Sequence, residues 1–234
     1  MRAGVPVPDA QVTSVADAIA RMEAIDAALP AADGIACFNR MYLEVTQEVN
    51  SQISAGFFAD PVFMAQLDVT FANLYFAAAG SLGDLAAVPA AWLPLAQRRD
   101  MAGIEPIQFA LAGMNAHINH DLPLAVVSTC QALATAPDAE PHYADYQKVD
   151  QLLDAAEQSV RESFETAAEV AVDRHLAAVA DLIGNWTIND ARDLAWTNCL
   201  LLWAVRDDEI ARGLFLDALT ASTAMASRML LVAV

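Results

Sequence analysis

The sequence predicts an all-α fold, a single bundle of about eight helices. Apolar residues recur every three to four positions along most of the chain, and candidate helix caps precede these runs. No stretch alternates apolar and polar residues between hairpin turns, so no strand is expected. With 56% hydrophobic and 18% charged residues, much of the chain must be core, an apolar cavity or a subunit interface.

The first helix follows a flexible lead-in, residues 1–11, which contains two prolines and a glycine. We assign residues 12–234 to one domain, because nothing in them resembles a linker. Thr13 or Ser14 can cap the helix, with Asp17 completing a capping box. The helical spacing stops at Pro30 and comprises Val15, Ile19, Met22, Ile25 and Leu29.

Two further helices complete the N-terminal half. Asp33 opens one that continues to about Ile53. Asp60-Pro61 is a cap followed by proline at the first helical position, and it starts a helix through about Ala79. This helix is apolar nearly all round and should be central and buried.

The segment from Gly80 to Asp100 is broken by Gly83, Pro89 and Pro94, so it is expected to be a long loop with short helical turns. Its W-L-P and R-R-D pieces are read either as a lid or as an irregular surface connection.

The helical pattern returns at Ile104 and resumes over Leu124–Ala134 after an interruption. Pro123 disfavours helical geometry at Leu122, so a break or kink is expected beside His120 and Asp121.

Three helices are expected in the C-terminal part. A long acidic amphipathic helix should follow the turn at Pro137–Pro141, running from Tyr143 to about Leu182, with Gly184 ending it. The other two are a helix from the capping box Thr187/Asp190 through Val205, which carries Trp196, Leu200 and Trp203, and a final helix from Glu209 capped by Asp207 or Asp208.

The net charge of −18, from 12 basic and 30 acidic residues, argues against two classes of partner. Such a surface repels phosphate backbones and anionic membranes, so no nucleic acid and no membrane is expected as a partner. The longest apolar runs, such as Cys199–Val205, are too short to span a bilayer, and no signal peptide is recognisable. Cys37, Cys130 and Cys199 are widely spaced and are expected to be buried thiols, which favours a cytoplasmic location.

The stretch Leu111–Leu124 concentrates hydrogen-bonding groups inside an apolar run. On a continuous helix His117, His120 and Asp121 share a face, because they are three and four residues apart. Imidazole and carboxylate at this spacing suit proton transfer, and they also suit a divalent metal, although no cofactor is required.

A structural interpretation of the same stretch stands beside the functional one. Asp121 is a suitable N-cap for the helix after Pro123, and His117 can be a hydrogen-bonded core residue. Asn115 and Asn119 can satisfy kinked backbone. A kinked polar helix junction needs similar residues, so both interpretations remain open.

A second set of candidate residues lies elsewhere in the chain. Asp68 is a polar exception on the apolar third helix; it is expected to pair with Arg40, or to act as an acid or base with a raised pKa if it lines a cavity. Arg40 can also pair with Glu44 along its own helix. Candidate substrate contacts are Tyr42, Tyr75, Trp196 and Arg40, although aromatic residues more often belong to the core.

Two short motifs resemble those of known helical enzymes. His120-Asp121 resembles the dipeptide of HD-type phosphohydrolases, but their pattern needs a histidine further upstream and none precedes His117 here. Residues 185–193, N-W-T-I-N-D-A-R-D, are similar in spacing to the magnesium and diphosphate motif of class I terpene synthases, but Asn189 stands where serine or threonine is expected. Helix capping, with Arg192 paired to a carboxylate, is the favoured interpretation of that stretch.

Several longer blocks together resemble an uncharacterised all-helical family common in actinobacteria. They are A-C-F-N-R-M-Y, F-F-A-D-P-V-F, L-D-V-T-F-A-N-L-Y, G-M-N-A-H-I-N-H-D-L-P-L and A-R-D-L-A-W-T-N. The resemblance implies an all-α bacterial protein and brings no catalytic residues with it.

These observations lead to three functional hypotheses. The first is an enzyme for a small apolar metabolite, working by acid/base isomerisation, cyclisation or elimination around His117, His120 and Asp121. The second is a metal-dependent hydrolase or oxidase, with His142, His175 or Asp68 completing the ligands. The third is a non-enzymatic carrier or an oligomeric scaffold such as a homodimer.

Overall fold

A computed structural model describes residues 10–153 and 188–233 of the chain. The described residues form helices and no strands, which confirms the all-α prediction. The lead-in over residues 1–9 lies outside the described residues. So do most of the long helix predicted from Tyr143, its end at Gly184, the cap at Thr187, and Asn185 and His175.

The three N-terminal helices begin at the predicted caps. Ser14 Oγ accepts the Asp17 amide at α1 (Val15–Ala28), and Asp33 accepts the Ile35 amide at α2 (Gly34–Ser54). Asp60 accepts the Phe63 amide at α3 (Pro61–Gly80). Because α3 is apolar on every side, α1 and α2 can pack against it on one side and α6 on another.

The segment after α3 contains η1 (Ser81–Gly83) and α4 (Leu93–Arg98) and is packed into the fold. Trp92 is 1% exposed and Arg99 is 4% exposed, and the Arg99 guanidinium lies 3.5 Å from the Asp33 carboxylate. The lid interpretation does not fit the W-L-P and R-R-D pieces, because Trp92, Leu95 and Arg99 are buried in the fold.

The centre of the chain is one continuous helical rod built from α5 (Pro106–Met114), the π-helical turn η2 (Asn115–Asp121) and α6 (Leu122–Ala132). Residues 142–153 are helical, and α9 (Ile188–Ala204) and α10 (Glu209–Leu230) follow. Asp208 accepts the amides of Ile210 and Ala211, which confirms the predicted cap of the last helix.

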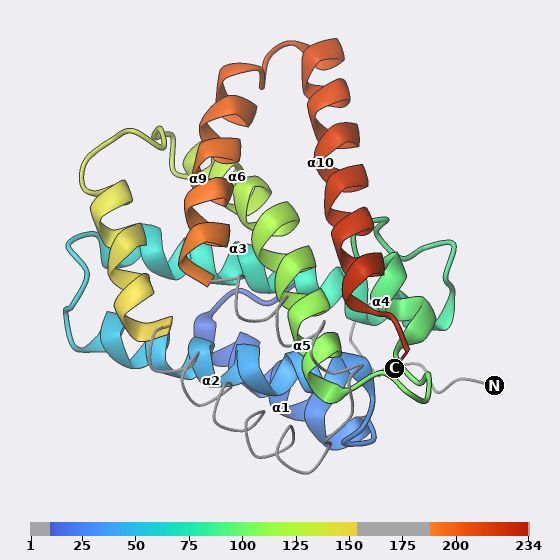
Figure 1. Ribbon diagram of the computed structural model, residues 1–234. Coiled ribbons are helices and arrows are strands. Elements are labelled where there is room, and N and C mark those ends of the chain that lie inside the picture. Colours follow the sequence, from blue (N-terminus) through green and yellow to red (C-terminus); the bar gives the residue numbers. More distant parts are fainter. Residues whose placement is uncertain (1–9, 154–187, 234) are drawn as a thin grey trace.

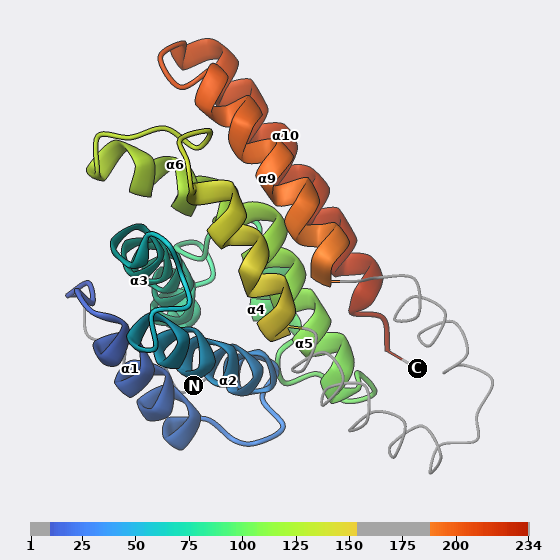
Figure 2. The same cartoon turned by 90° about the vertical axis from the view of Figure 1, so that its left-hand side faces the viewer.

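The rod separates two layers of helices (Figures 1 and 2). Helices α1, α2 and α3 lie on one side of it, with α2 against α5 and α3 against α6. Helices α9 and α10 lie on the other side; α9 packs on α6 and η2, while α10 packs on η2, α5 and α4. The π-helical turn therefore sits where both layers meet.

Helix α3 has a second property that the sequence pattern did not predict. Together with η1 it forms the helical stretch Pro61–Gly83, which by length and composition is long and apolar enough to cross a membrane. This differs from the expectation that every apolar run of the sequence is too short to do so. Buried core helices meet the same criterion, and α3 is in contact with α1, α2, α6 and η2. The three cysteines are buried free thiols, as expected.

Candidate functional site

The π-helical turn replaces the predicted break at Pro123. Leu122 keeps helical backbone angles, φ −63° and ψ −43°, and its amide bonds to the His117 carbonyl five residues back. A wider turn accommodates a proline, which has no amide hydrogen to donate. Of the predicted break or kink, the break is therefore absent, and the irregularity at this position is the π-helical turn. The predicted N-cap role of Asp121 is wrong, because its side chain makes no cap hydrogen bond.

Asp121 instead collects hydrogen bonds from three side chains. Its Oδ2 accepts Trp92 Nε1 at 2.8 Å and lies 3.2 Å from His117 Nδ1, and its Oδ1 lies 2.8 Å from His120 Nδ1. Burial raises the pKa of this carboxyl, but the bonds from His117 and His120 outweigh burial and hold the pKa below its ordinary value. Asp121 is thus a buried carboxylate that fixes the orientation of both imidazoles.

His117 has one ring nitrogen held and one free. With Nδ1 donating to Asp121, Nε2 carries the lone pair, and this buried atom has no hydrogen-bond partner. Burial lowers the pKa of His117, and Asp121 offsets only part of that effect. The ring stacks on Phe71 at 3.5 Å between centroids, and Tyr42 contacts it edge-on at 4.5 Å. A neutral, rigidly held imidazole results.

A cavity of about 90 Å³ lies beside this imidazole. That is several times the roughly 10–15 Å³ that a single water needs. Helices α2 and α3, the rod, the helix over 142–153 and α9 supply its lining, which is Phe38, Met41, Tyr42, Val45, Val49, Met64, Leu67, Asp68, Phe71, Met114, His117, Ile118, Leu122, Tyr146, Val149, Leu153, Ile188 and Arg192.

Two more residues that line the cavity have a buried polar atom without a hydrogen-bond partner, namely Asp68 with Oδ2 and Tyr42 with its hydroxyl. Burial raises the pKa of Asp68 to about 7, so this carboxyl carries a proton for part of the time near neutral pH. Burial also raises the pKa of Tyr42, and the nearby Asp68 charge adds to the effect. Unsatisfied buried polar groups are costly, and three of them on residues that line one apolar cavity make this cavity the candidate ligand site.

Arg192 also lines the cavity, and its guanidinium group already has partners. Its Nε donates to Asp150, its Nη2 donates to the Tyr146 carbonyl, and its guanidinium carbon lies 4.0 Å from the Tyr146 ring centroid. This pairing with a carboxylate agrees with the capping interpretation of the 185–193 stretch. Arg192 therefore offers no unpaired cation to an anionic ligand.

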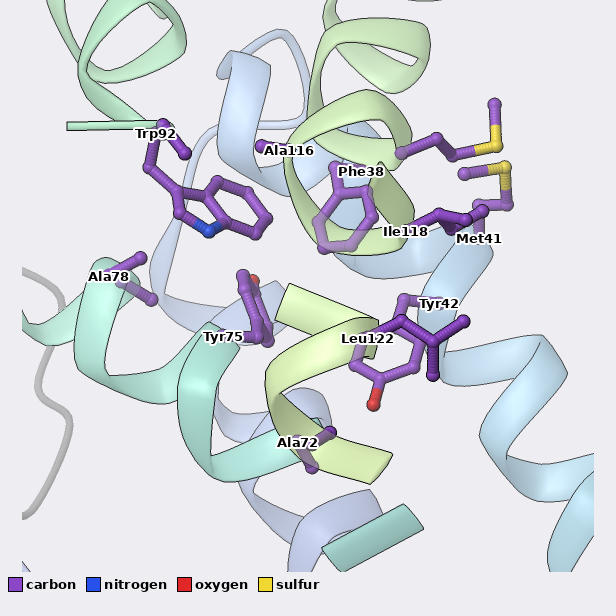
Figure 3. Close-up of a cluster of buried hydrophobic side chains, with 14 of the residues drawn as sticks. Phe38, Met41, Tyr42, Ala72, Tyr75, Ala78, Trp92, Ala116, Ile118 and Leu122 are labelled. Carbon is purple, nitrogen blue, oxygen red and sulfur yellow. The ribbon is translucent and has the colours of Figure 1, made fainter. Parts of the chain in front are cut away.

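Further aromatic side chains contact the His117 ring, and Figure 3 shows three of them. Phe38, Tyr75 and Trp92 lie beside one another, and Phe38 contacts the His117 ring edge-on at 5.5 Å. Phe38 fits only because residue 113 is glycine, since a Cβ there would lie 2.5 Å from the Phe38 ring. This close approach fixes the distance between α2 and the rod.

The remaining polar residues of the turn face α10 and do not line the cavity. Asn115 Nδ2 donates to the Thr223 carbonyl and to Ser227 Oγ, both at 2.9 Å. Asn119 Nδ2 donates to Asn115 Oδ1. His120 Nε2 lies 3.1 Å from Thr220 Oγ1.

Three of the four predicted substrate contacts are also placed elsewhere. The Tyr75 hydroxyl is buried and donates to Asn39, and Trp196 packs on Tyr146. Arg40 bonds to Asp26 and to the Ala31 carbonyl at the surface, so the predicted pairs with Asp68 and Glu44 are replaced. Of these four residues only Tyr42 lines the cavity.

No three His, Cys, Asp or Glu residues within 10–153 and 188–233 are grouped so as to hold a metal ion. The reason is visible at His117 and His120, whose Nδ1 atoms both bond to Asp121 and whose Nε2 atoms face different surroundings. His142 stacks on Phe63 and bonds to the Ala136 carbonyl, outside the cavity wall.

Two residues that complete the site do not stand out in the sequence. Trp92 belongs to the segment interpreted as a lid, although an indole N–H that becomes buried needs an acceptor such as Asp121. Phe71, which stacks on His117, lies one helical turn after Asp68 on α3. This spacing places Phe71 on the same face of α3 as Asp68, and it could have indicated that both residues belong to one site.

Comparison with known proteins identifies a family and no characterised relative. No curated protein and no solved structure matches the chain. Residues 15–233 match a protein family described as a family of unknown function, DUF5995. The match agrees with the resemblance of the sequence to an uncharacterised helical family, and the chain therefore belongs to the DUF5995 family.

Proposed function

We propose that the chain is an acid/base enzyme that moves a proton within a small, neutral, largely apolar metabolite bound in the cavity beside His117. The observation that carries the proposal is the buried, unpartnered Nε2 of His117, a residue that lines the cavity, with Nδ1 held by Asp121. A neutral imidazole oriented through its other nitrogen is the usual form of a histidine general base.

Asp68 provides the complementary acid. Its pKa of about 7 lies above its ordinary value, whereas that of His117 is lowered, so near neutral pH one group can donate a proton and the other can accept one. The surroundings shift the two pKa values in opposite directions, and shifts of this kind assign separate acid and base roles to a pair of titratable groups. The Tyr42 hydroxyl can donate a hydrogen bond to the same ligand.

The cavity wall supports a neutral, compact substrate. Apart from Asp68, His117, the two tyrosines and the paired Arg192, its lining is aliphatic, thioether and phenyl. A carboxylate or phosphate would find no unpaired cation among these residues. Exclusion of water strengthens each remaining polar contact.

Isomerisation is the reaction that His117 and Asp68 could catalyse without a co-reactant. Nε2 takes a proton from a substrate carbon, the electron pair of that C–H bond shifts within the substrate, and Asp68 gives its proton to another substrate atom. Return of the proton from His117 to Asp68 restores the site, so no co-reactant is consumed. Elimination and cyclisation are alternative uses of the same pair.

Deuterium exchange tests the proposal because it detects proton transfer at carbon in any compound that enters the cavity. The full-length protein is incubated in D₂O with cyclopentanone, 3-pentanone and a neutral metabolite extract, and mass spectrometry records gains of one mass unit. His117→Ala and Asp68→Asn should each slow exchange by at least about 100-fold, the usual range for loss of a general acid or base. His142→Gln, which alters a buried histidine outside the cavity wall, should exchange at the wild-type rate.

The Asp121→Asn variant tests whether Asp121 orients the His117 imidazole or only stabilises the fold. An amide presents only one acceptor oxygen to the Trp92, His117 and His120 donors, so the His117 tautomer should change. We expect slower exchange, a shifted pH profile and an altered ¹⁵N spectrum of His117. Undiminished exchange by His117→Ala would refute the proposal, and probe binding without any exchange would favour a carrier.

A further inference from the structure

Helix α10 carries an apolar stripe on its exposed side. It consists of six residues, called here the outer seam, of which the four large ones are 77%, 67%, 62% and 61% exposed in chain order. Their spacing of four, four, three, four and four residues keeps them on one side of a helix. They are Ile210, Leu214, Ala218, Ala221, Met225 and Met229.

The other side of α10 is already in use. Thr223 and Ser227 are buried and bond to Asn115, and Thr220 bonds to His120. The helix is thus fixed to the π-helical turn by one face while the outer seam stays exposed. Contiguous exposed apolar surface of this kind is typical of an interaction site.

The order of residues along the outer seam reads the same in both directions: two large, two small, two large. In an antiparallel pair related by a two-fold axis between Ala218 and Ala221, Ile210 faces Met229 and Leu214 faces Met225. Ala218 then faces Ala221, and the small side chains let the two helices approach closely. A two-fold interface requires such self-complementarity.

Charge favours the same arrangement. Asp207, Asp208 and Glu209 stand at the start of α10, and Arg228 stands near its end. An antiparallel pair places the acidic end of one helix beside Arg228 of the other, whereas a parallel pair would bring the acidic ends together. By the 3.6-residue period Arg212 falls on the side away from the outer seam, so it does not oppose Arg228 there.

We propose that a second copy of this chain docks antiparallel on the outer seam and forms a homodimer. This inference is independent of the proposed enzyme activity, because no residue of the outer seam lines the cavity. With a net charge of −18 on each chain, the copies repel each other outside the contact, so added salt should strengthen the dimer.

Sedimentation equilibrium of the full chain over a wide concentration range tests whether a second copy of the chain binds to the outer seam. The wild type should form a dimer, and Ala218→Glu should raise the dimer dissociation constant at least tenfold, because it places two carboxylates in the closest part of the contact. Ala20→Glu, the same change at an exposed position of α1, should behave like the wild type. Unchanged far-UV circular dichroism will show that Ala218→Glu still folds.

Disulfide trapping tests the direction of docking. Leu214→Cys and Met225→Cys chains, mixed and oxidised, should give a mixed disulfide dimer, whereas Leu214→Cys alone should not, because its two sulfurs would lie about 16 Å apart. The native cysteines are buried and leave a low background. A wild type that stays monomeric, or an Ala218→Glu chain that dimerises as tightly as the wild type, would overturn the proposal. Crosslinking of Leu214→Cys alone would overturn the antiparallel arrangement.

Discussion

At the scale of single residues, the site is defined by polar atoms that lack partners. Three residues that line one cavity, His117, Asp68 and Tyr42, each have a buried polar atom without a hydrogen bond. Asp121, which holds His117, accepts three hydrogen bonds. Buried polar atoms without partners reduce stability, and proteins retain them where a ligand completes them. Asp68 shows this cost most directly, since burial alone raises its pKa.

Replacing Asp68 by asparagine should therefore stabilise the fold at neutral and alkaline pH. The folded carboxyl has a pKa of about 7 against an ordinary value of 3.8, so between these values the folded state binds more protons and stability falls as pH rises. Asp68→Asn removes this loss, on the order of 2–4 kcal/mol at pH 8, and should have little effect below about pH 4. Thermal unfolding from pH 3 to pH 9 measures the difference.

Asp193→Asn on the exposed side of α9 provides the matched control for Asp68→Asn, and its melting temperature should follow the wild type at every pH. An Asp68→Asn chain less stable than the wild type at pH 8 would show that Asp68 is ionised and paired in the folded state.

At the scale of elements, the π-helical turn contacts both layers of helices. Its His117 faces the cavity between the rod, α2 and α3, while Asn115 and His120 hold α10. The extra residue of a π-turn rotates successive side chains relative to an α-helix, so neighbouring polar residues can serve different neighbours. The position of α10 is thereby linked to the position of the imidazole.

Asn115→Ala should loosen α10 selectively. The change removes three hydrogen bonds, two donated to the Thr223 carbonyl and the Ser227 hydroxyl and one accepted from Asn119, a loss of about 2–3 kcal/mol. Hydrogen exchange should rise most in Glu209–Leu230 and little in α1. Asn50→Ala on α2 is the control, and equal exchange in α10 of the variant and the wild type would contradict the role given to Asn115.

At the scale of the whole molecule, the net charge and the apolar core have opposite effects on the stability of the folded state. A net charge of −18 disfavours the compact state through self-repulsion, while the 56% hydrophobic composition supplies a large core.

Salt should therefore stabilise the protein. Raising sodium chloride from about 0.02 M to about 0.5 M shortens the Debye length from roughly 20 Å to roughly 4 Å and screens most of the repulsion. We expect the melting temperature to increase by several degrees, and potassium chloride should have the same effect. A melting temperature that falls with salt would mean that attractive ion pairs outweigh the net repulsion.

The class of fold and most helix starts follow from local sequence alone. Ser14, Asp33, Asp60 and Asp208 each cap the helix that follows, because a cap and its amide partners are neighbours in the chain. The same locality made α3 recognisable as a buried helix. His117 and Asp121 could be paired in advance, since they lie four residues apart on one helix.

Which of these residues share a site depends on how the helices pack. Asp68 and His117 line one cavity, while Asn115 and His120, although close to His117 in sequence, bond to α10. Trp92 reaches Asp121 across 29 positions of the chain. A helical period fixes which face a residue occupies, whereas the packing of helices distant in the chain determines what that face meets.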